Sequence, residues 1–268
     1  MRKSAIAGIV AAGAAALAVA AIFGFGFSGS AMAQSKASTN SATIYHGVPR
    51  IHANGTAAST NWSGYAVTGA NGAYTDVKGS WVEPTATCSK RSTAYSSFWV
   101  GLDGYNSNSV EQLGTDSDCS RGTPTYYGWY EMYPNPSFEL SPSAYPVSPG
   151  DTLTAEVKYN GNSTYTLSMS SSRGWNFSTT QSGSFSNSSA EWIAEAPSSC
   201  NRTCSVLPLA NFGTMNFSNS TANGATIGSY GSSVWEEITM VTSGGTVKAQ
   251  PSALNGGGNG FSDTWHHS

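Results

Sequence analysis

The chain has 268 residues and a formal net charge of −3, and only 10% of its residues are Asp, Glu, Lys or Arg. A surface with so little charge and no basic cluster argues against nucleic acid or an anionic membrane as a partner. Once an N-terminal targeting segment is set aside, the remaining residues are enough for one large all-β domain or two small domains.

The N-terminus has the pattern of a secretory signal. Arg2 and Lys3 precede an apolar run from Ala5 to about Phe27, and the small residues Ser-Ala-Met-Ala follow. The alternative is a single membrane anchor, because the run is long enough to cross a bilayer. The small residues and the absence of stop-transfer charges favour a cleaved signal peptide over residues 1–33. We therefore expect a secreted, extracellular protein that keeps no stable membrane association after cleavage.

Residues 34–60 are polar and show no apolar periodicity, with Gly47, Pro49 and Gly55 as breakers. This composition predicts a short prosegment or flexible leader. The alternative is an ordered N-terminal strand, which the pattern favours only from Asn61 onward. The domain is therefore expected to span residues 61–268.

The rest of the chain shows no helical spacing of apolar residues. It consists of short runs of Val, Tyr, Trp, Thr and Phe that are separated by Gly, Pro, Asn and Ser. Such runs are typical of a β-sandwich or barrel. Strands are expected at residues 77–82, 97–103, 125–133, 152–159, 164–170, 190–195 and 234–242, with a last edge strand at 261–265.

All four cysteines lie beyond the signal, and an even number in an exported chain predicts two disulfides. Three pairings are possible. Proximity in the sequence favours Cys88 with Cys119 and Cys200 with Cys204. Zinc is the alternative, but the spacings contain no CxxC pair and no neighbouring histidine, so no metal is expected.

The histidines are His46, His52, His266 and His267, in the leader or at the C-terminal end. A Ser-His-Asp or Cys-His catalytic group and a histidine metal site are therefore not expected in the domain. No GxSxG, HExxH or P-loop pattern occurs either. Carboxylates, carboxamides and aromatic rings remain as the chemically useful groups, and we expect no cofactor.

Four predicted strands each carry polar residues on one face and apolar or aromatic residues on the other, because side chains alternate along a strand. If these strands are neighbours, the polar faces form an aromatic-lined groove for a peptide or a glycan. The alternative is that the rings and acids are ordinary surface residues. The polar faces comprise Trp99, Gly101 and Asp103; Gln112, Gly114 and Asp116; Trp129, Glu131 and Tyr133; and Glu191, Ile193 and Glu195.

Four sequence blocks resemble the motifs of one known family. Residues 98–104 (FWVGLDG), 112–116 (QLGTD), 129–134 (WYEMYP) and 190–193 (AEWI) follow one another in the order and at about the spacing of the glutamic peptidase (eqolisin) motifs, and 61–64 (NWSG) resembles the N-terminal motif. The resemblance covers the chain from 61 to the C-terminus. Four blocks together make it specific.

The resemblance implies an all-β fold, a concanavalin A-like β-sandwich of two large, bent antiparallel sheets. It implies a secreted, acid-active endopeptidase that acts on polypeptides without a metal, and we expect a monomer. The catalytic residues of the family fall on Glu191 and Gln112. Its substrate-binding residues fall on Trp99, Asp103, Asp116, Trp129, Glu131 and Tyr133. The chain differs from fungal members in its short leader, its cysteine positions and the Cys200 to Cys204 hairpin.

A carboxylate can take a proton from an attacking water and pass it to the leaving amine, and a carboxamide can hydrogen-bond the oxyanion. Glu191 and Gln112 suit these roles, with Glu191 expected near its ordinary pKa. Asp103, Asp116 and Glu131 are expected to orient the pair or bind substrate. Two alternatives use the same groove: a lectin-like glycan-binding module, and a glycosidase with Glu131 and Glu191 roughly 5 to 9 Å apart. No role is assigned to Glu83, Glu139, Glu236 and Glu237, which are expected at the surface or in turns.

Overall fold

The computed structural model describes residues 43–47, 51–53, 57–201 and 203–268, with backbone only for 51–53, and all of them belong to the unit Ala33–Ser268. The expected signal peptide, residues 1–33, lies outside the described residues. Within them the structure is strands and turns with one 3-10 helix, η1 (Ile227–Tyr230). None of the described helical structure is long and apolar enough to cross a membrane. The all-β expectation is confirmed.

Every strand expected from the sequence is present. The bounds are β1 (Thr43–Tyr45), β2 (Ile51–Ala53), β3 (Ala57–Ser59), β4 (Trp62–Thr68), β5 (Asp76–Val82), β6 (Thr93–Ala94), β7 (Ser97–Leu102), β8 (Val110–Ser120), β9 (Thr123–Tyr133), β10 (Phe138–Glu139), β11 (Thr152–Gly161), β12 (Thr164–Ser171), β13 (Asn176–Ser182), β14 (Ser189–Glu195), β15 (Ser198–Cys200), β16 (Cys204–Val206), β17 (Thr214–Ala222), β18 (Ala225–Thr226), β19 (Trp235–Val241), β20 (Val247–Pro251) and β21 (Phe261–Trp265).

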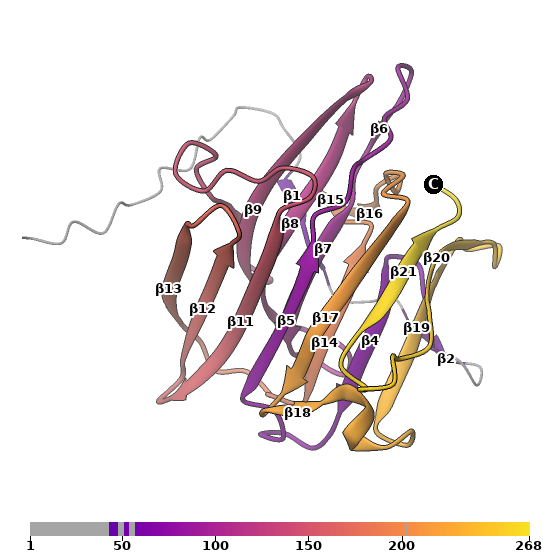
Figure 1. Cartoon of the computed structure of the whole chain (residues 1–268). Coiled ribbons are helices and arrows are strands. Elements are labelled where there is room, and N and C mark those ends of the chain that lie inside the picture. The colour runs from indigo at the N-terminus through magenta and orange to yellow at the C-terminus, as the bar shows by residue number, and fades with distance from the viewer. Residues whose placement is uncertain (1–42, 48–50, 54–56, 202) are drawn as a thin grey trace, which may run out of the picture. The chain divides into compact units, whose positions relative to one another are not determined.

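The long strands form two layers (Figure 1). One layer follows the order β13, β12, β11, β5, β17, β21 and β20. The other follows β19, β4, β14, β7, β8, β9 and β10, and β19 also pairs with β20, so the two are continuous. These pairings are all antiparallel. The sequence prediction that β21 is an edge strand is wrong, because β21 lies between β17 and β20.

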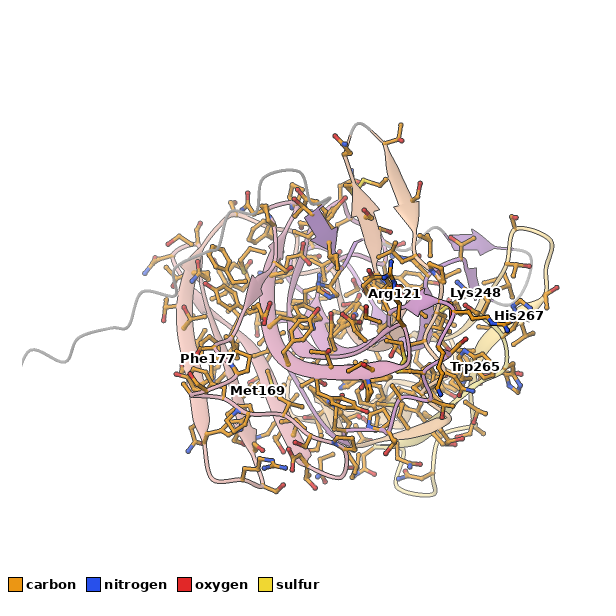
Figure 2. All side chains as sticks on the ribbon, turned by 90° about the horizontal axis from the view of Figure 1, so that it is seen from above. Arg121, Met169, Phe177, Lys248, Trp265 and His267 are labelled. Atoms are coloured by element: carbon orange, nitrogen blue, oxygen red, sulfur yellow. A yellow bond between two sulfur atoms is a disulfide. The ribbon has the colours of Figure 1, made fainter. Side chains whose placement is uncertain are left out.

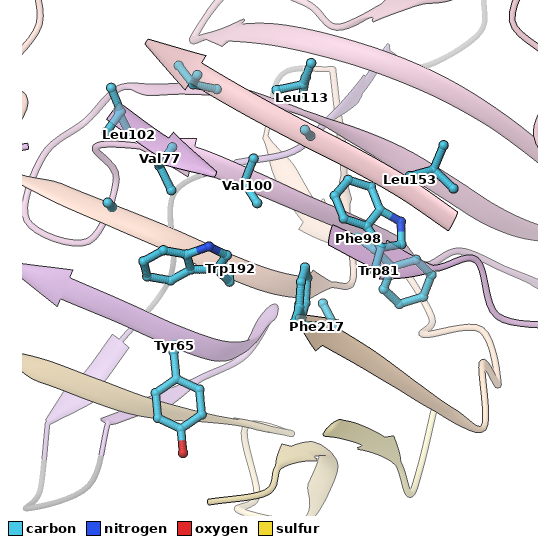
Figure 3. Packing of buried hydrophobic residues seen from close by; sticks show 14 of the residues in the cluster. Tyr65, Val77, Trp81, Phe98, Val100, Leu102, Leu113, Leu153, Trp192 and Phe217 are labelled. Atoms are coloured by element: carbon cyan, nitrogen blue, oxygen red, sulfur yellow. The ribbon is translucent and has the colours of Figure 1, made fainter. Parts of the chain in front are cut away.

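The layers enclose a large apolar core (Figure 3). From the second layer, Phe98, Val100 and Leu113 point into it, and from the first layer Val77 and Leu153 do so. Each of these side chains is fully buried, which contributes about 1.5 to 3 kcal/mol per residue. This burial fixes which face of β7 and β8 points inward, and so fixes the opposite face as well.

Glu83 also lies in this interior, at 1% exposure, and the expectation of a surface or turn acid is wrong. Its two carboxylate oxygens accept hydrogen bonds from Thr115 (2.5 Å) and Ser117 (2.6 Å). Burial raises its pKa to about 7, although these hydrogen bonds act in the opposite direction. The hydroxyls on the inward face of β8 thus reduce the free-energy cost of burying this carboxyl.

Gly114 has no room for a side chain. A Cβ there would lie 2.2 Å from the Phe98 carbonyl oxygen and 2.6 Å from the Trp99 Cβ. We expect Gly114→Ala to lower the free energy of unfolding by about 2 to 3 kcal/mol, because the backbone of β7 would have to move. Urea unfolding of this variant and of Gly256→Ala, where a Cβ meets nothing within 4 Å, measures the difference. Equal stability of the two variants would contradict the packing described.

Both favoured disulfides are present, Cys88 with Cys119 and Cys200 with Cys204. The second closes the hairpin of β15 and β16. No group of acidic, histidine or cysteine side chains among the described residues is arranged to hold a metal ion.

Candidate active site

Four polar or small residues form one row across adjacent strands. Glu191 on β14 pairs with Gly101 on β7, Gly101 pairs with Gln112 on β8, and Gln112 pairs with Glu131 on β9. Neighbouring strands lie about 4.8 Å apart, so the backbones of Glu191 and Gln112 are separated by roughly 10 Å. Gly101 between them has no side chain. A carboxylate and a carboxamide therefore lie on the same face of the sheet, on either side of a glycine.

Two further rows lie on the same face of the sheet. Ile193, Trp99, Gly114 and Trp129 form one of them, which is mainly aromatic. Glu195, Ser97, Asp116 and Tyr127 form the next, which is acidic. The predicted alternation of faces is confirmed on all four strands, because the intervening residues belong to the core between the layers. The apolar side chains of this face form a cluster of their own, with members Ala57, Trp62, Ala66, Trp99, Val110, Trp129, Ile193 and Ile238, joined by Tyr105, Tyr127 and Tyr133.

The acidic face is covered rather than open. Glu191, Gln112, Asp116 and Glu131 are all 0% exposed. A short piece of the leader, residues 43–47, which we call the leader strap, lies over Gln112, Asp116 and Glu131. The sequence predicts a short prosegment or flexible leader over residues 34–60; within that range the structure orders residues 43–47, of which the first three form β1 and the last two are buried.

His46 of the strap is bound by the acidic row. Its ring stacks on Trp129 with centroids 3.5 Å apart and planes within 4°. Nδ1 lies 3.2 Å from the Glu131 carboxylate, and Nε2 lies 3.2 Å from the Asp116 carboxylate. Burial disfavours charge on the ring, but attraction and hydrogen bonding to Asp116 and Glu131 outweigh it and raise the pKa of His46 to about 10. His46 is therefore an imidazolium held between two carboxylates.

The backbone of the strap is bound as well. Gln112 donates its Nε2 to the His46 carbonyl oxygen at 2.5 Å, and the His46 amide donates to Glu131 at 2.9 Å. Gly47 donates to Glu195 at 3.1 Å, and its carbonyl accepts from the Trp62 indole at 2.9 Å. The groove therefore already holds a segment of polypeptide in hydrogen-bonded contact.

Glu191 is electrostatically distinct from its neighbours. Neither of its carboxylate oxygens meets the criteria for a hydrogen bond with any described residue. Burial raises its pKa well above the ordinary value; the nearby Ser189 side chain and Tyr105 backbone lower it, and Asp103 raises it. The expectation of a near-ordinary pKa for Glu191 is therefore wrong for the buried side chain.

Asp103 follows β7 and has a positive φ of 67°. Its carboxylate accepts hydrogen bonds from the backbone amides of Asn187 (2.6 Å) and Ser188 (2.9 Å), and from the Ser188 hydroxyl (2.9 Å). These residues immediately precede β14, the strand of Glu191. Both oxygens of Asp103 are thus engaged in holding the start of that strand.

Asp116 and Glu195 make the other polar contacts of the face. Tyr127 donates its hydroxyl to Asp116 at 2.8 Å and also lies 2.9 Å from Asp118. Trp99 donates its indole to Glu195 at 2.9 Å. Trp99 in turn packs edge-on against Trp62, with ring centroids 4.8 Å apart. Aromatic donors therefore hold the acids of the third row in place.

Sequence reasoning placed no histidine in this site and so missed His46. Its partner Glu131 is 85 residues away in the sequence, and nothing in the polar leader distinguishes the strap from its neighbours. The other histidines with described side chains are at the C-terminus, where His267 lies beside Lys248 and Trp265, away from Met169 and Phe177 (Figure 2).

Glu131 and Glu191 lie three strands apart, so their backbones are separated by roughly 14 Å. Gln112 and Gly101 stand between them in the row, and the Glu131 carboxylate is engaged with His46 rather than turned to Glu191. The geometry therefore does not favour the glycosidase alternative.

The two-layer β-sandwich with its acidic, aromatic-lined face fits the class of glutamic peptidases, as the comparisons with known proteins bear out. The family model of the Peptidase A4 family matches residues 60–258, and the chain belongs to this family.

Two curated relatives are fungal peptidases. Aspergillopepsin-2 of Aspergillus niger is 30% identical over 196 residues, which cover 63% of this chain and 67% of that protein. Scytalidopepsin B of Scytalidium lignicola is 30% identical over 172 residues, or 61% and 63% of the two chains. The match to the second thus spans less than two thirds of its length.

A solved structure shares the fold. The scytalido-glutamic peptidase in complex with a transition state analog inhibitor superposes with a TM-score of 0.66 at 23% identity, over 77% of this chain and 98% of that one. The β-sandwich expectation is confirmed, and a glycan-binding function is not favoured.

Proposed function

We propose that Glu191 and Gln112 are the catalytic pair with which this glutamic endopeptidase hydrolyses peptide bonds in polypeptide substrates. The observation that supports the pair is the hydrogen bond from Gln112 Nε2 to the carbonyl oxygen of His46. This carboxamide already binds a peptide carbonyl in the groove, and Glu191 lies in the same row with no side chain between them.

In the proposed reaction, ionised Glu191 accepts a proton from a water molecule as the water oxygen attacks the carbonyl carbon. Gln112 donates a hydrogen bond to the oxygen that becomes negative. Glu191 then passes its proton to the amide nitrogen, the carbon–nitrogen bond breaks, and a carboxylic acid and an amine leave. Water is the nucleophile, so no covalent intermediate forms and no metal is needed.

This reaction needs a Glu191 that can ionise, whereas burial in the covered groove raises its pKa well above the ordinary value. Entry of solvent to the carboxylate would bring the pKa down. Acid-range activity then requires that water reaches Glu191.

The remaining groove residues are proposed to bind substrate. Trp99 and Trp129 supply apolar walls, and Tyr133 borders the strap, where its ring packs edge-on against Tyr45 with centroids 6.3 Å apart. Asp116 and Glu131 supply negative charge beside the bound peptide. Asp103 acts through the start of β14 and is a positioning residue.

We also propose that residues 1–33 are removed and that the protein is secreted as a monomer. The signal-like N-terminus and two disulfides support an exported protein.

The role of Gln112 is tested with Gln112→Ala. We expect kcat to fall about a hundredfold or more at the pH of greatest wild-type activity, because the developing negative charge loses its donor. The measurement is hydrolysis of a denatured protein substrate without added metal. The matched control is Gln181→Ala on β13, whose amide contacts only Thr179 among the described residues. Activity within threefold of the control would remove Gln112 from the pair.

A further inference from the structure

Glu111 is a buried carboxyl that takes no direct part in the proposed reaction. It lies on β8 immediately before Gln112 and pairs with Leu102, the last residue of β7. Side chains alternate along a strand, so Glu111 points away from the groove, toward the core that contains Leu102 (Figure 3). Its exposure is 0%. An acid in this position is costly unless a specific contact compensates for its burial.

The compensating contact is with Asp103. This residue follows Leu102 at the point where β7 has ended, with a φ of 67°, and its carboxylate is hydrogen-bonded with the Glu111 side chain. Two carboxyls form such a bond only when one of them carries a proton. Both oxygens of Asp103 already accept hydrogen bonds from Asn187 and Ser188. The proton therefore belongs to Glu111, which donates it to Asp103.

The groups that face Glu111 favour its protonated form. Burial raises its pKa well above the ordinary value, and so do the charge of Asp103, the hydrogen bond with Asp103 and the charge of Glu191, whereas the Ser109 side chain lowers it. Tyr165 on β12 also faces Glu111, because burial and then the charge of Glu111 raise the pKa of this phenol. None of these groups is a cation. Glu111 is therefore neutral in the acid range and ionises only at higher pH.

Asp103 in turn holds the segment that leads into β14. Its carboxylate accepts hydrogen bonds from the backbone amides of Asn187 and Ser188, and its own amide donates to the carbonyl oxygen of Ser189 at 3.0 Å. Ser189 is the first residue of β14, and Glu191 comes two residues later. The contacts of Asp103 therefore set the position of the proposed catalytic carboxylate.

The proposed reaction also needs a group that stays protonated. Glu191 starts the reaction ionised, so its own titration explains a loss of activity at low pH only. A loss of activity toward neutral pH requires a second group that must carry a proton. Neither Gln112 nor the attacking water titrates in this range. Glu111 is a protonated group next to Gln112 in the chain and in contact with Asp103.

We propose that protonated Glu111 is a positioning residue, which donates a hydrogen bond to Asp103 and so holds Glu191 in place, and that loss of this proton ends activity as the pH rises. This rests on the proposed function, because Glu111 acts through Glu191. Once the proton has left, the carboxylates of Glu111 and Asp103 repel each other. The new negative charge also opposes the ionisation of Glu191 that the reaction needs.

The sign of the effect on stability is the same. The folded state raises the pKa of Glu111 above the unfolded value. Its contribution to stability is therefore complete below the unfolded pKa and is lost as the pH rises through the folded one. The contact with Asp103 is strongest in acid, where the peptidase is expected to act.

The first experiment detects the proton and does not depend on activity. In the full chain carrying Glu191→Gln, infrared spectra are compared with and without Glu111→Gln at about pH 6, where an ordinary glutamate is ionised. We expect the C=O band of one protonated carboxyl to be lost with Glu111→Gln. An unchanged band would mean that Glu111 is ionised, and would overturn the proposal.

The second experiment measures the hold on β14, again in the Glu191→Gln chain. Hydrogen exchange of the Asn187 and Ser188 amides is followed by NMR in acid. Glu111→Leu removes the donor but keeps a side chain that can be buried, and we expect both amides to exchange about tenfold faster. Glu111→Gln still donates to Asp103 and should not have this effect. Equal exchange in the two variants would overturn the link through Asp103.

The third experiment is the pH profile of kcat/KM for a denatured protein substrate. Gln donates a hydrogen bond but cannot ionise, so Glu111→Gln should move the loss of activity at higher pH upward by about one pH unit or more. The matched control is Glu83→Gln, which removes another buried acid of the interior and should leave this loss in place. An unmoved profile, or an equal shift in both variants, would overturn the proposal.

The kinetic constants separate positioning from substrate binding. Glu111→Leu should lower kcat about tenfold at the acid optimum with KM little changed, because Glu111 acts on Glu191 and not on substrate. A raised KM with unchanged kcat would overturn the positioning role. If the infrared and exchange results are as expected but the wild-type chain cleaves no substrate at any pH, the contact of Glu111 with Asp103 stands and the proposed function fails.

Discussion

Replacement of Glu191 by Gln is expected to lower kcat/KM by about a thousandfold or more, within the range for loss of a general base and acid. The side chain keeps its size but can no longer take a proton from water. Gln112 remains in place, so substrate binding and the oxyanion contact persist. The measurement is hydrolysis of a denatured protein substrate at the wild-type optimum.

The fold of this variant should be intact or more stable. Glu191 is 0% exposed and its burial disfavours the charged form, so a neutral amide removes that penalty. Thermal unfolding near neutral pH tests this. Glu156→Gln, on β11 of the other layer, is the control and should retain full activity. Activity of Glu191→Gln within tenfold of that control would sink the catalytic assignment.

The inward and outward faces of the site strands were predictable because side chains alternate strictly along a strand. On β7, for example, Phe98 and Val100 must point into the core, and this fixes the direction of the side chains on the opposite face. The row that joins Glu191 to Gln112 was not predictable from any one strand, since it depends on the pairing of β7 and β8 with β14, which lies far from them in the sequence. The family resemblance was what indicated that these strands lie next to one another.

Features outside the alternating strands were not predictable. His46 is held by Asp116 and Glu131, which are 70 and 85 residues away. Glu83 ends up between the layers because Thr115 and Ser117 lie opposite it. The leader around His46 looks polar, and Glu83 precedes a proline that suggests a turn, so neither residue looks buried from the sequence. Only the tertiary fold brings their partners to them, and both expectations failed for that reason.

Several buried carboxyls suit this fold to acid. Burial raises the pKa of Glu83 to about 7 and that of Asp263 to about 8. In both, the folded state holds a proton that the unfolded chain releases at lower pH. Their contribution to stability is therefore complete below the unfolded pKa values and is lost as the pH rises through the folded ones. The protein should be more stable in acid than near neutrality.

Replacing Glu83 by Gln should remove one part of this dependence. A pKa raised from 4.5 to about 7 corresponds to about 3 kcal/mol of stability lost between pH 4 and pH 8. Gln resembles the protonated acid and cannot ionise, so the variant should lose about 3 kcal/mol less over that interval. Urea unfolding at both pH values, with Glu191→Gln in both proteins to prevent self-digestion, measures the difference. Asp263 is unchanged in both proteins, so some pH dependence should remain; an identical pH dependence with and without Glu83 would mean that folding does not raise the pKa of this carboxyl.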